Sequence, residues 1–133
     1  LDLRSSKKDT QNVIYQWINT NDRYNSKSWK IDIIGKRIIA WISNSRLTYE
    51  DGSIDYKDKF NGIIKKQINH LINEIKISEL INDKIIGCAA IILTGLSYPQ
   101  NNNYLKTGLS LLKKLAKYSL DNNGFPNQET LGN

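Results

Sequence analysis

The hydrophobic and polar positions of the chain are organised around one apolar stretch, residues 85–96, which reads Ile-Ile-Gly-Cys-Ala-Ala-Ile-Ile-Leu-Thr-Gly-Leu. It contains no charged residue, so we expect it to be covered on all sides. It is shorter than the roughly 20 residues that a membrane-spanning helix needs. Its length and its alanine pair favour a helix beginning at Ser78 or Asn82, and its many isoleucines leave a buried strand as the alternative. We expect the central helix of the domain here.

Four further segments repeat apolar residues at the spacing of an amphipathic helix. The first is expected to begin at Asp9 or Thr10, whose side chains can cap a helix, and to end before the polar residues 19–22. The last is expected to pack through a single apolar face. That face consists of Leu105, Leu109, Leu112, Leu115 and Ala116. The four expected helices cover residues 9–18, 32–44, 56–77 and 104–120.

Two segments leave a strand open as an alternative. Residues 29–33 alternate apolar and polar positions, whereas residues 34–42 place their apolar side chains on one helical face, which favours the helix. Asp51 and Gly52 form a typical hairpin pair, but the runs on either side of them are short and charged. We interpret this pair as a turn between helices, with a small hairpin as the alternative.

The expected connections are short, and short connections make neighbouring helices antiparallel. The sequence therefore predicts an all-α array of antiparallel helical hairpins. We divide the chain into a flexible lead-in (1–8), an α-helical domain (9–121) and an extended or disordered tail (122–133). The chain contains no Met, and we expect it to be a piece of a longer polypeptide.

The net charge of +6 and the pI of about 9.4 favour anionic partners. Heavy use of Ile, Asn and Lys makes part of this excess a bias of composition, and lysine-rich helix faces are by default solvated surface. Basic residues alternate with acidic ones and no helix-turn-helix spacing occurs, so a nucleic acid is not an expected partner. With one His in the chain, and with Cys88 inside the apolar segment where a packing role is expected, we predict neither a metal nor a cofactor.

Several side chains are candidates for a binding site. Arg37 lies within the apolar face of the second helix, one turn before Trp41. An unpaired buried guanidinium is costly, so we expect carboxylate or carbonyl oxygens around it, either as a structural ion pair or as a site for a substrate carboxylate. His70 is either a half-buried residue bonded to a backbone carbonyl or part of a site wall. Trp17, Trp29 and Trp41 are either core residues or platforms for a sugar ring.

A set of short motifs occurs in a defined order between residues 13 and 127. The motifs are Trp17-Ile18, Asn21, Trp29, Gly35-Lys36-Arg37-Ile38, Trp41-Ile42, Gln67, His70-Leu71, Gly108-Leu109, Leu112, Leu115 and the stretch 121–126. This order and spacing resembles the N-terminal helical region of heparinase II/III-like polysaccharide lyases. The resemblance implies an incomplete α/α toroid whose cleft binds an acidic polysaccharide, and a β-elimination at a uronic acid.

The resemblance also implies roles for particular residues. Asn127 would neutralise the substrate carboxylate, and Gln128, Arg37, Trp41 and His70 would bind substrate. The catalytic Tyr and His of that family lie downstream of residue 133, so we expect no lyase activity from this chain alone.

The expected partner is an acidic polysaccharide, without a membrane span, and both the bacterial periplasm and the cytoplasm stay open as compartments. The other hypothesis is a non-catalytic helical scaffold or interaction module with a basic surface. Uncovered faces of an incomplete toroid also predict self-association.

Overall fold

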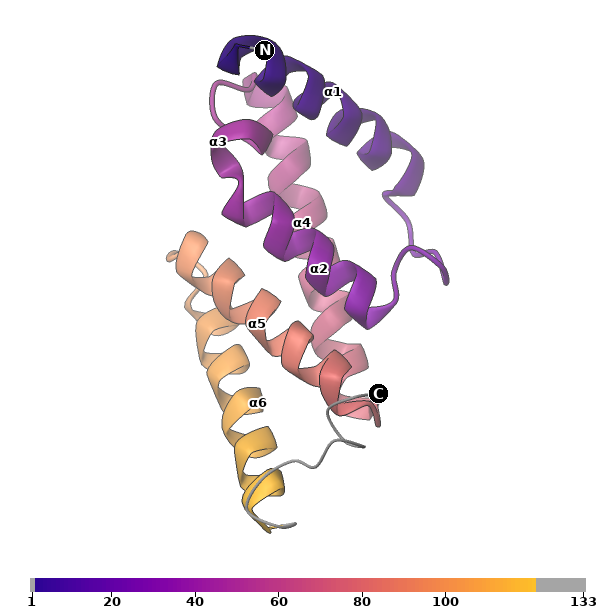
Figure 1. Ribbon diagram of the computed structural model, residues 1–133, viewed down its shortest axis with the longest axis vertical. Helices are drawn as coiled ribbons and strands as arrows, with labels where there is room; N and C mark the ends of the chain where they lie inside the picture. The colour runs from indigo at the N-terminus through magenta and orange to yellow at the C-terminus, as the bar shows by residue number, and fades with distance from the viewer. Residues whose placement is uncertain (1, 122–133) are drawn as a thin grey trace.

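The computed structural model describes residues 2–121, apart from the side chain of Asn102, and this part of the chain contains six α-helices and no strand (Figure 1). The all-α prediction is confirmed, whereas the division into hairpins of a toroid stays a prediction. The helices are α1 (Leu3–Asn21), α2 (Ile31–Ser43), α3 (Ser45–Thr48), α4 (Ile54–Ile77), α5 (Ile81–Ser97) and α6 (Asn102–Asp121). The predicted tail 122–133, with Asn127 and Gln128, lies outside the described residues.

Helices α2, α4 and α5 form the centre of the molecule, and α1 and α6 lie toward opposite ends of its long axis (Figure 1). The long helix α4 passes behind both α2 and α5. At one end α1 packs against α3 and α4, and at the other end the backbone of α6 approaches that of α5 but of no other described helix. One side of α6 is therefore left without a helical neighbour in the described part of the chain.

The core is built largely from isoleucine and centres on α4. The predicted apolar stripe of this helix is confirmed, since Phe60, Ile64, Ile68, Leu71 and Ile75 are all buried. Ser53 precedes helix α4 and caps its first turn, because its hydroxyl accepts a hydrogen bond from the backbone N–H of residue 56. The side chains of this stripe meet those of α2 and α5 in one continuous cluster.

The central segment 85–96 forms part of helix α5, so the strand alternative is wrong. Its small residues allow close packing: Gly87, Cys88 and Ala90 are buried. The expectation that it is covered on all sides is wrong as well. Ile85 is 38% exposed and Leu96 is 62% exposed. Among the described helices only α2, α4 and α6 pack on α5, and they leave its fourth side open.

The first helix begins at Leu3 and not at Asp9 or Thr10 as expected. Asp2 caps it, because its carboxylate accepts a hydrogen bond of 2.8 Å from the backbone N–H of Ser5. Lys7 then holds the added turns against the turn before α4, since its Nζ lies 2.6 Å from Oδ2 of Asp51. The contact between Lys7 and Asp51 joins residues 44 positions apart in sequence, which a local pattern does not reveal.

Residues 31–43 form helix α2, as predicted, and the strand alternative for residues 29–33 is wrong. The pair Asp51-Gly52 forms a turn between helices, so the hairpin alternative is wrong too. Asp51 adopts a φ of 63°, a left-handed conformation that Asp tolerates better than most residues. The short helix α3 just before this turn was not expected.

The last helix forms where it was predicted, but only part of its predicted face packs. Leu105 and Leu115 are half-buried, whereas the other three residues of that face are exposed. Leu109 is 51% exposed and Leu112 is 40% exposed, and Ala116 is exposed as well. Gly108 instead faces α5, because a Cβ atom at this position would lie 2.7 Å from Cγ1 of Ile92. Helix α6 thus has two apolar stripes, and the one around Gly108 packs inward because glycine lets the two backbones approach closely.

Candidate functional site

Arg37 sits half-buried between α1, α2 and α4 with neutral partners. Its Nη1 donates a hydrogen bond of 2.6 Å to Oε1 of Gln67, and its Nη2 donates one of 2.7 Å to the carbonyl oxygen of Ser28. The guanidinium carbon lies 4.2 Å from the centre of the Trp17 ring, a cation–π contact. Burial lowers the pKa of Arg37. Within the described residues no ion pair joins Arg37 to a carboxylate, so the ion-pair interpretation is wrong and the carbonyl alternative is confirmed.

Trp17 contacts this arginine, and the other two tryptophans lie in the adjoining core or against it. Trp17 meets Trp41 edge to face with ring centres 5.3 Å apart, and Trp41 packs on Phe60 at 5.8 Å. Trp29 is buried and donates a hydrogen bond of 3.3 Å from its indole nitrogen to the carbonyl oxygen of Asn21. All three tryptophans belong to the core or pack against it. The core interpretation of these residues is therefore confirmed.

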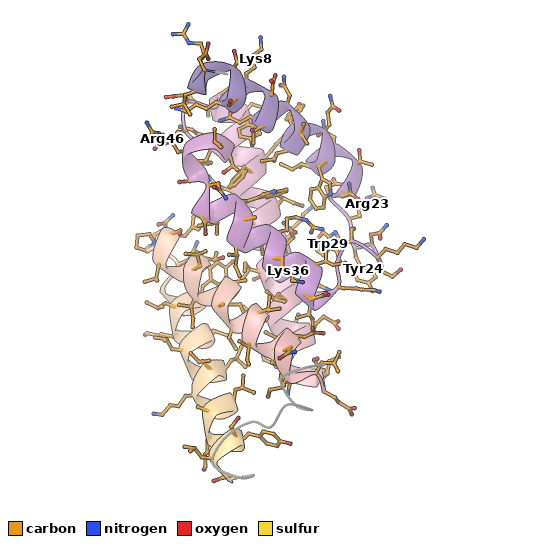
Figure 2. All side chains as sticks on the ribbon, in the orientation of Figure 1. Lys8, Arg23, Tyr24, Trp29, Lys36 and Arg46 are labelled. Carbon is orange, nitrogen blue, oxygen red and sulfur yellow. The ribbon has the colours of Figure 1, made fainter. Side chains whose placement is uncertain are left out.

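His70 is half-buried, as expected, and contacts two aromatic rings. Its ring centre lies 5.5 Å from that of Trp29 and 5.1 Å from that of Tyr24. Tyr24 is 64% exposed and lies beside Trp29 in the segment between α1 and α2 (Figure 2). Adjoining contacts thus link the predicted residues Arg37, Trp41 and His70, while Asn127 and Gln128 lie outside the described residues.

This arrangement holds a fixed positive charge against aromatic rings, but it does not pair a nucleophile with a base. The sequence pattern located Arg37 correctly within an apolar face. It did not reveal that Gln67, on the apolar stripe of α4, would be its partner across the helix interface. Gln67 is fully buried and also donates a hydrogen bond of 3.2 Å to the carbonyl oxygen of Ile63. Its amide is satisfied by contacts within the fold.

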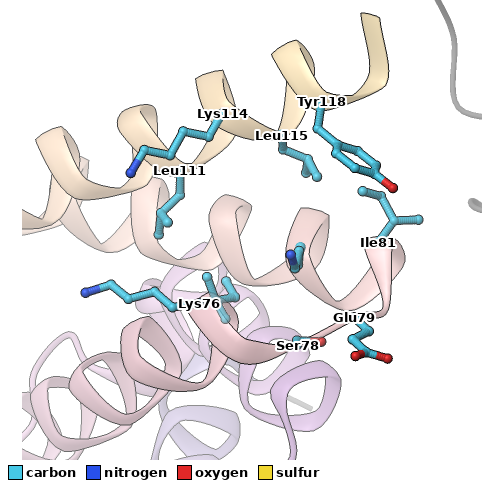
Figure 3. Close-up of a pocket in the computed structure, with 10 residues that line it drawn as sticks. Lys76, Ser78, Glu79, Ile81, Leu111, Lys114, Leu115 and Tyr118 are labelled. Carbon is cyan, nitrogen blue, oxygen red and sulfur yellow. The ribbon is translucent and has the colours of Figure 1, made fainter. Parts of the chain in front are cut away.

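A cavity of about 580 Å³ opens between the end of α4, the start of α5 and the second half of α6 (Figure 3). Ile75, Ile81, Leu111 and Leu115 supply its apolar wall. Its charged and polar residues are Lys76, Lys84, Lys114, Ser78, Glu79 and Tyr118. Lys76 and Lys114 extend from facing helices at one end, and Ser78, Glu79 and Tyr118 lie at the other (Figure 3). Because the three lysines come from three helices, only the fold brings them together.

A second feature of this end of the molecule is an uncovered apolar surface on α5 and α6. On α5, Ile85, Ala89 and Leu96 are exposed, and Ile92 beside them is half-buried. On α6, Leu109, Leu112 and Ala116 are exposed, and Leu105 is half-buried. We call these eight residues the α5/α6 apolar face. The exposed Lys106, Lys113 and Lys117 lie seven and four residues apart, which places them in one row along α6; we call them the α6 lysine stripe.

The described residues hold no cluster of His, Cys, Asp and Glu side chains arranged to bind a metal ion. In residues 2–121 no helix combines the length and the apolar character that crossing a bilayer requires. Burial raises the pKa of the Cys88 thiol, which keeps it protonated and unreactive at neutral pH.

No family model, curated protein or solved structure gives a significant match to this chain. The resemblance to heparinase II/III-like lyases therefore stays a prediction made from the sequence.

Proposed function

We propose that this chain is a non-catalytic helical interaction module that binds an acidic partner at the end of the molecule formed by α5 and α6. The observation that carries the proposal is the charge of α6. Between residues 102 and 120 the helix has four lysines and no acidic residue, which is most of the net charge of +6. These lysines stand beside uncovered leucines, a combination that marks interaction surfaces.

The surroundings of this helix support the proposal. Lys76 and Lys84 bring two further positive charges to the cavity beside Lys114. Elsewhere on the described surface, basic and acidic residues neutralise one another more closely, as where Lys7 pairs with Asp51 and Glu50. The cavity also holds the carboxylate of Glu79, but its lysines outnumber this acid, and a surface with an excess of one sign of charge attracts and orients partners of the opposite sign.

Retention on immobilised heparin, used only as a polyanion, tests the proposal. We expect Lys113→Gln/Lys117→Gln to elute at clearly lower salt than the unmodified chain. The matched control is Lys27→Gln/Lys30→Gln, which removes the same charge from two exposed residues outside α6. If both double variants elute together, retention reports only net charge and the proposal is wrong.

The second candidate is the helical part of a heparinase II/III-like lyase of uronate-containing polysaccharide, inactive as this chain alone. One observation favours it, concerning residues that the resemblance assigns to substrate binding. Arg37 and Trp41 both contact Trp17, and His70 packs on Trp29, the chain neighbour of Ser28, whose carbonyl oxygen accepts a hydrogen bond from Arg37. The guanidinium of Arg37 also has no carboxylate partner in the described residues, so its positive charge is not neutralised there.

Alginate and heparin separate the two candidates. The lyase candidate predicts that Arg37→Gln and His70→Gln weaken binding of these polymers more than Lys113→Gln/Lys117→Gln does, with circular dichroism confirming that the variants fold. The interaction-module proposal predicts the reverse order. Both candidates predict no new absorbance from unsaturated uronate, and turnover by this chain would contradict both.

A further inference from the structure

The α5/α6 apolar face has the geometry of two sides of a three-helix bundle. On α5, residues 85, 89, 92 and 96 are four, three and four residues apart. On α6, residues 105, 109, 112 and 116 repeat the same spacing. Apolar residues alternating in steps of three and four form a seam along a helix, into which the side chains of a partner helix insert. The face therefore presents two parallel seams.

The two seams adjoin each other. Leu105 belongs to the α6 seam and touches α5 directly, because a Cβ atom at Gly95 would lie 2.5 Å from its backbone nitrogen. Ile92 belongs to the α5 seam and touches α6 at Gly108, where an added Cβ atom would lie 2.7 Å from Cγ1 of Ile92. Close approach of the backbones at these glycines brings the two seams side by side, and a third helix can pack its side chains between those of both helices.

The seams are exposed in the described part of the chain. Leu109 is 51% exposed, Leu96 is 62% exposed and Leu112 is 40% exposed. Single exposed leucines are ordinary, but a contiguous row of them across two packed helices marks an interaction site.

Charge identifies the kind of helix that fits. The α6 lysine stripe runs along the outer edge of the α6 seam, and no acidic residue of α6 precedes Asp121. In helical bundles the residues that flank the seam pair with opposite charges on the neighbouring helix. A partner with glutamate or aspartate beside its apolar seam would match this edge. A second copy of the chain would instead bring the same lysines and a net charge of +6.

We propose that the α5/α6 apolar face docks an acidic amphipathic helix from another polypeptide segment. This inference rests on the proposed function and specifies the partner. The bound helix lies along the two seams, buries its apolar side chains against the eight residues of the face, and sets its carboxylates against Lys106, Lys113 and Lys117.

The probe is a fluorescently labelled synthetic peptide of about three heptads, with Leu at the seam positions and Glu beside them. Its anisotropy is measured against increasing concentrations of the chain. Two control peptides are a scrambled version of the same composition and a version with Lys in place of every Glu. We expect the acidic peptide to bind and both controls to bind at least about tenfold more weakly.

Variants of the chain locate the contact. Leu109→Gln/Leu112→Gln should weaken peptide binding by at least about tenfold, since two buried leucines are lost from the interface. Lys113→Gln/Lys117→Gln should weaken it several-fold and flatten its salt dependence. The matched control is Val13→Gln/Ile54→Gln, because both side chains are strongly exposed, at 69% and 81%, and lie outside the face. Binding should be unchanged in this control.

Other results would overturn the inference. Sedimentation equilibrium that shows self-association abolished by Leu109→Gln/Leu112→Gln would assign the face to a second copy of the chain, as the sequence also predicts. Leucine-dependent binding to phosphatidylglycerol vesicles, without peptide binding, would assign it to a membrane surface. If the peptide fails to bind while heparin retention still depends on Lys113 and Lys117, the docking inference fails and the proposed function stands. If heparin retention is insensitive to these lysines as well, both fail.

Discussion

Two regions of this molecule accommodate side chains of unexpected polarity in opposite ways. Around Arg37, a charged side chain lies inside an apolar helix face, and its partners come from within the fold: an amide oxygen, a carbonyl oxygen and an indole ring. Around Leu109, apolar side chains lie on the surface and the described residues supply no cover. The charge of Arg37 is compensated by partners within the fold, whereas the leucines of α6 stay exposed.

This difference separates stability from function. A buried charge that the fold itself solvates stabilises one arrangement of helices, because removing it leaves its partners unsatisfied. An exposed apolar row contributes little to the stability of the isolated chain and becomes favourable only when a partner covers it. We therefore look for function at the α5/α6 end. The predictions below test this division, beginning with the largest expected effect.

Arg37→Ala is expected to lower the free energy of unfolding by about 2–4 kcal/mol, because it strands the buried Gln67 amide and removes the cation–π contact with Trp17. Urea unfolding followed by circular dichroism measures this change in the free energy of unfolding. A double-mutant cycle with Gln67→Leu should show coupling of about 1–2 kcal/mol.

The matched control for this variant is Arg23→Ala, since Arg23 is exposed in the segment between α1 and α2 (Figure 2). It should change the free energy of unfolding by less than about 0.5 kcal/mol. If both variants changed the free energy of unfolding equally, the partners of Arg37 would not stabilise the fold, and Arg37 would not differ from an exposed arginine.

The arginine also shows what sequence reasoning could and could not reach. An Arg within an apolar helical face predicts compensating oxygens, and the structure confirms carbonyl-type partners. Which oxygens they are depends on how α2 crosses α4, because Gln67 lies thirty residues away in the chain. Helix positions followed from local spacing, except for the first turns of α1 and the short helix α3. The first turns of α1 are held by the pairing of Lys7 with Asp51, far along the chain, and α3 has only four residues.

Sequence reasoning failed most clearly at α6. Leucines at helical spacing were assigned to the packed face, yet the helix has two apolar stripes, and spacing alone does not show which one faces inward. Gly108 decides the matter, since it permits the closest approach to α5. The lysines of the cavity could not be grouped from the pattern of any single helix, because Lys76, Lys84 and Lys114 are on three different helices.

Gly95→Ala tests the close contact that builds the α5/α6 end. A Cβ atom at this position would lie 2.5 Å from the backbone nitrogen of Leu105, and backbone cannot move aside cheaply. We expect a loss of about 1–3 kcal/mol in the free energy of unfolding. Gly62 provides the control, since a Cβ atom there meets nothing within 4 Å; Gly62→Ala should stabilise the chain by about 0.5–1 kcal/mol. Stabilisation by both variants would contradict the tight α5–α6 packing.

Tyr56, which joins α4 to α3, makes the stability of the fold sensitive to alkali. Burial raises the pKa of Tyr56 from 10.0 to about 12, and its hydroxyl donates a hydrogen bond of 2.6 Å to the carbonyl oxygen of Thr48. The folded state favours the protonated phenol, so its contribution is complete below pH 10 and is lost as the pH rises through 12. Tyr56→Phe should cost about 1 kcal/mol at pH 7 and reduce the loss of stability between pH 10 and 12. An unchanged alkaline profile would contradict this placement.

The smallest expected effect on stability comes from replacing exposed leucines of the α5/α6 apolar face. Leu109→Gln/Leu112→Gln should change the free energy of unfolding of the isolated chain by less than about 0.5 kcal/mol, since both side chains are exposed, at 51% and 40%, and Gln supports a helix almost as well as Leu. The reference is Leu71→Ala, a fully buried residue whose truncation should cost about 2–5 kcal/mol. Both are measured by urea unfolding at low chain concentration. A loss of about 2 kcal/mol or more in the double variant would mean that these leucines are covered within the chain itself. The α5/α6 apolar face would then be part of its core.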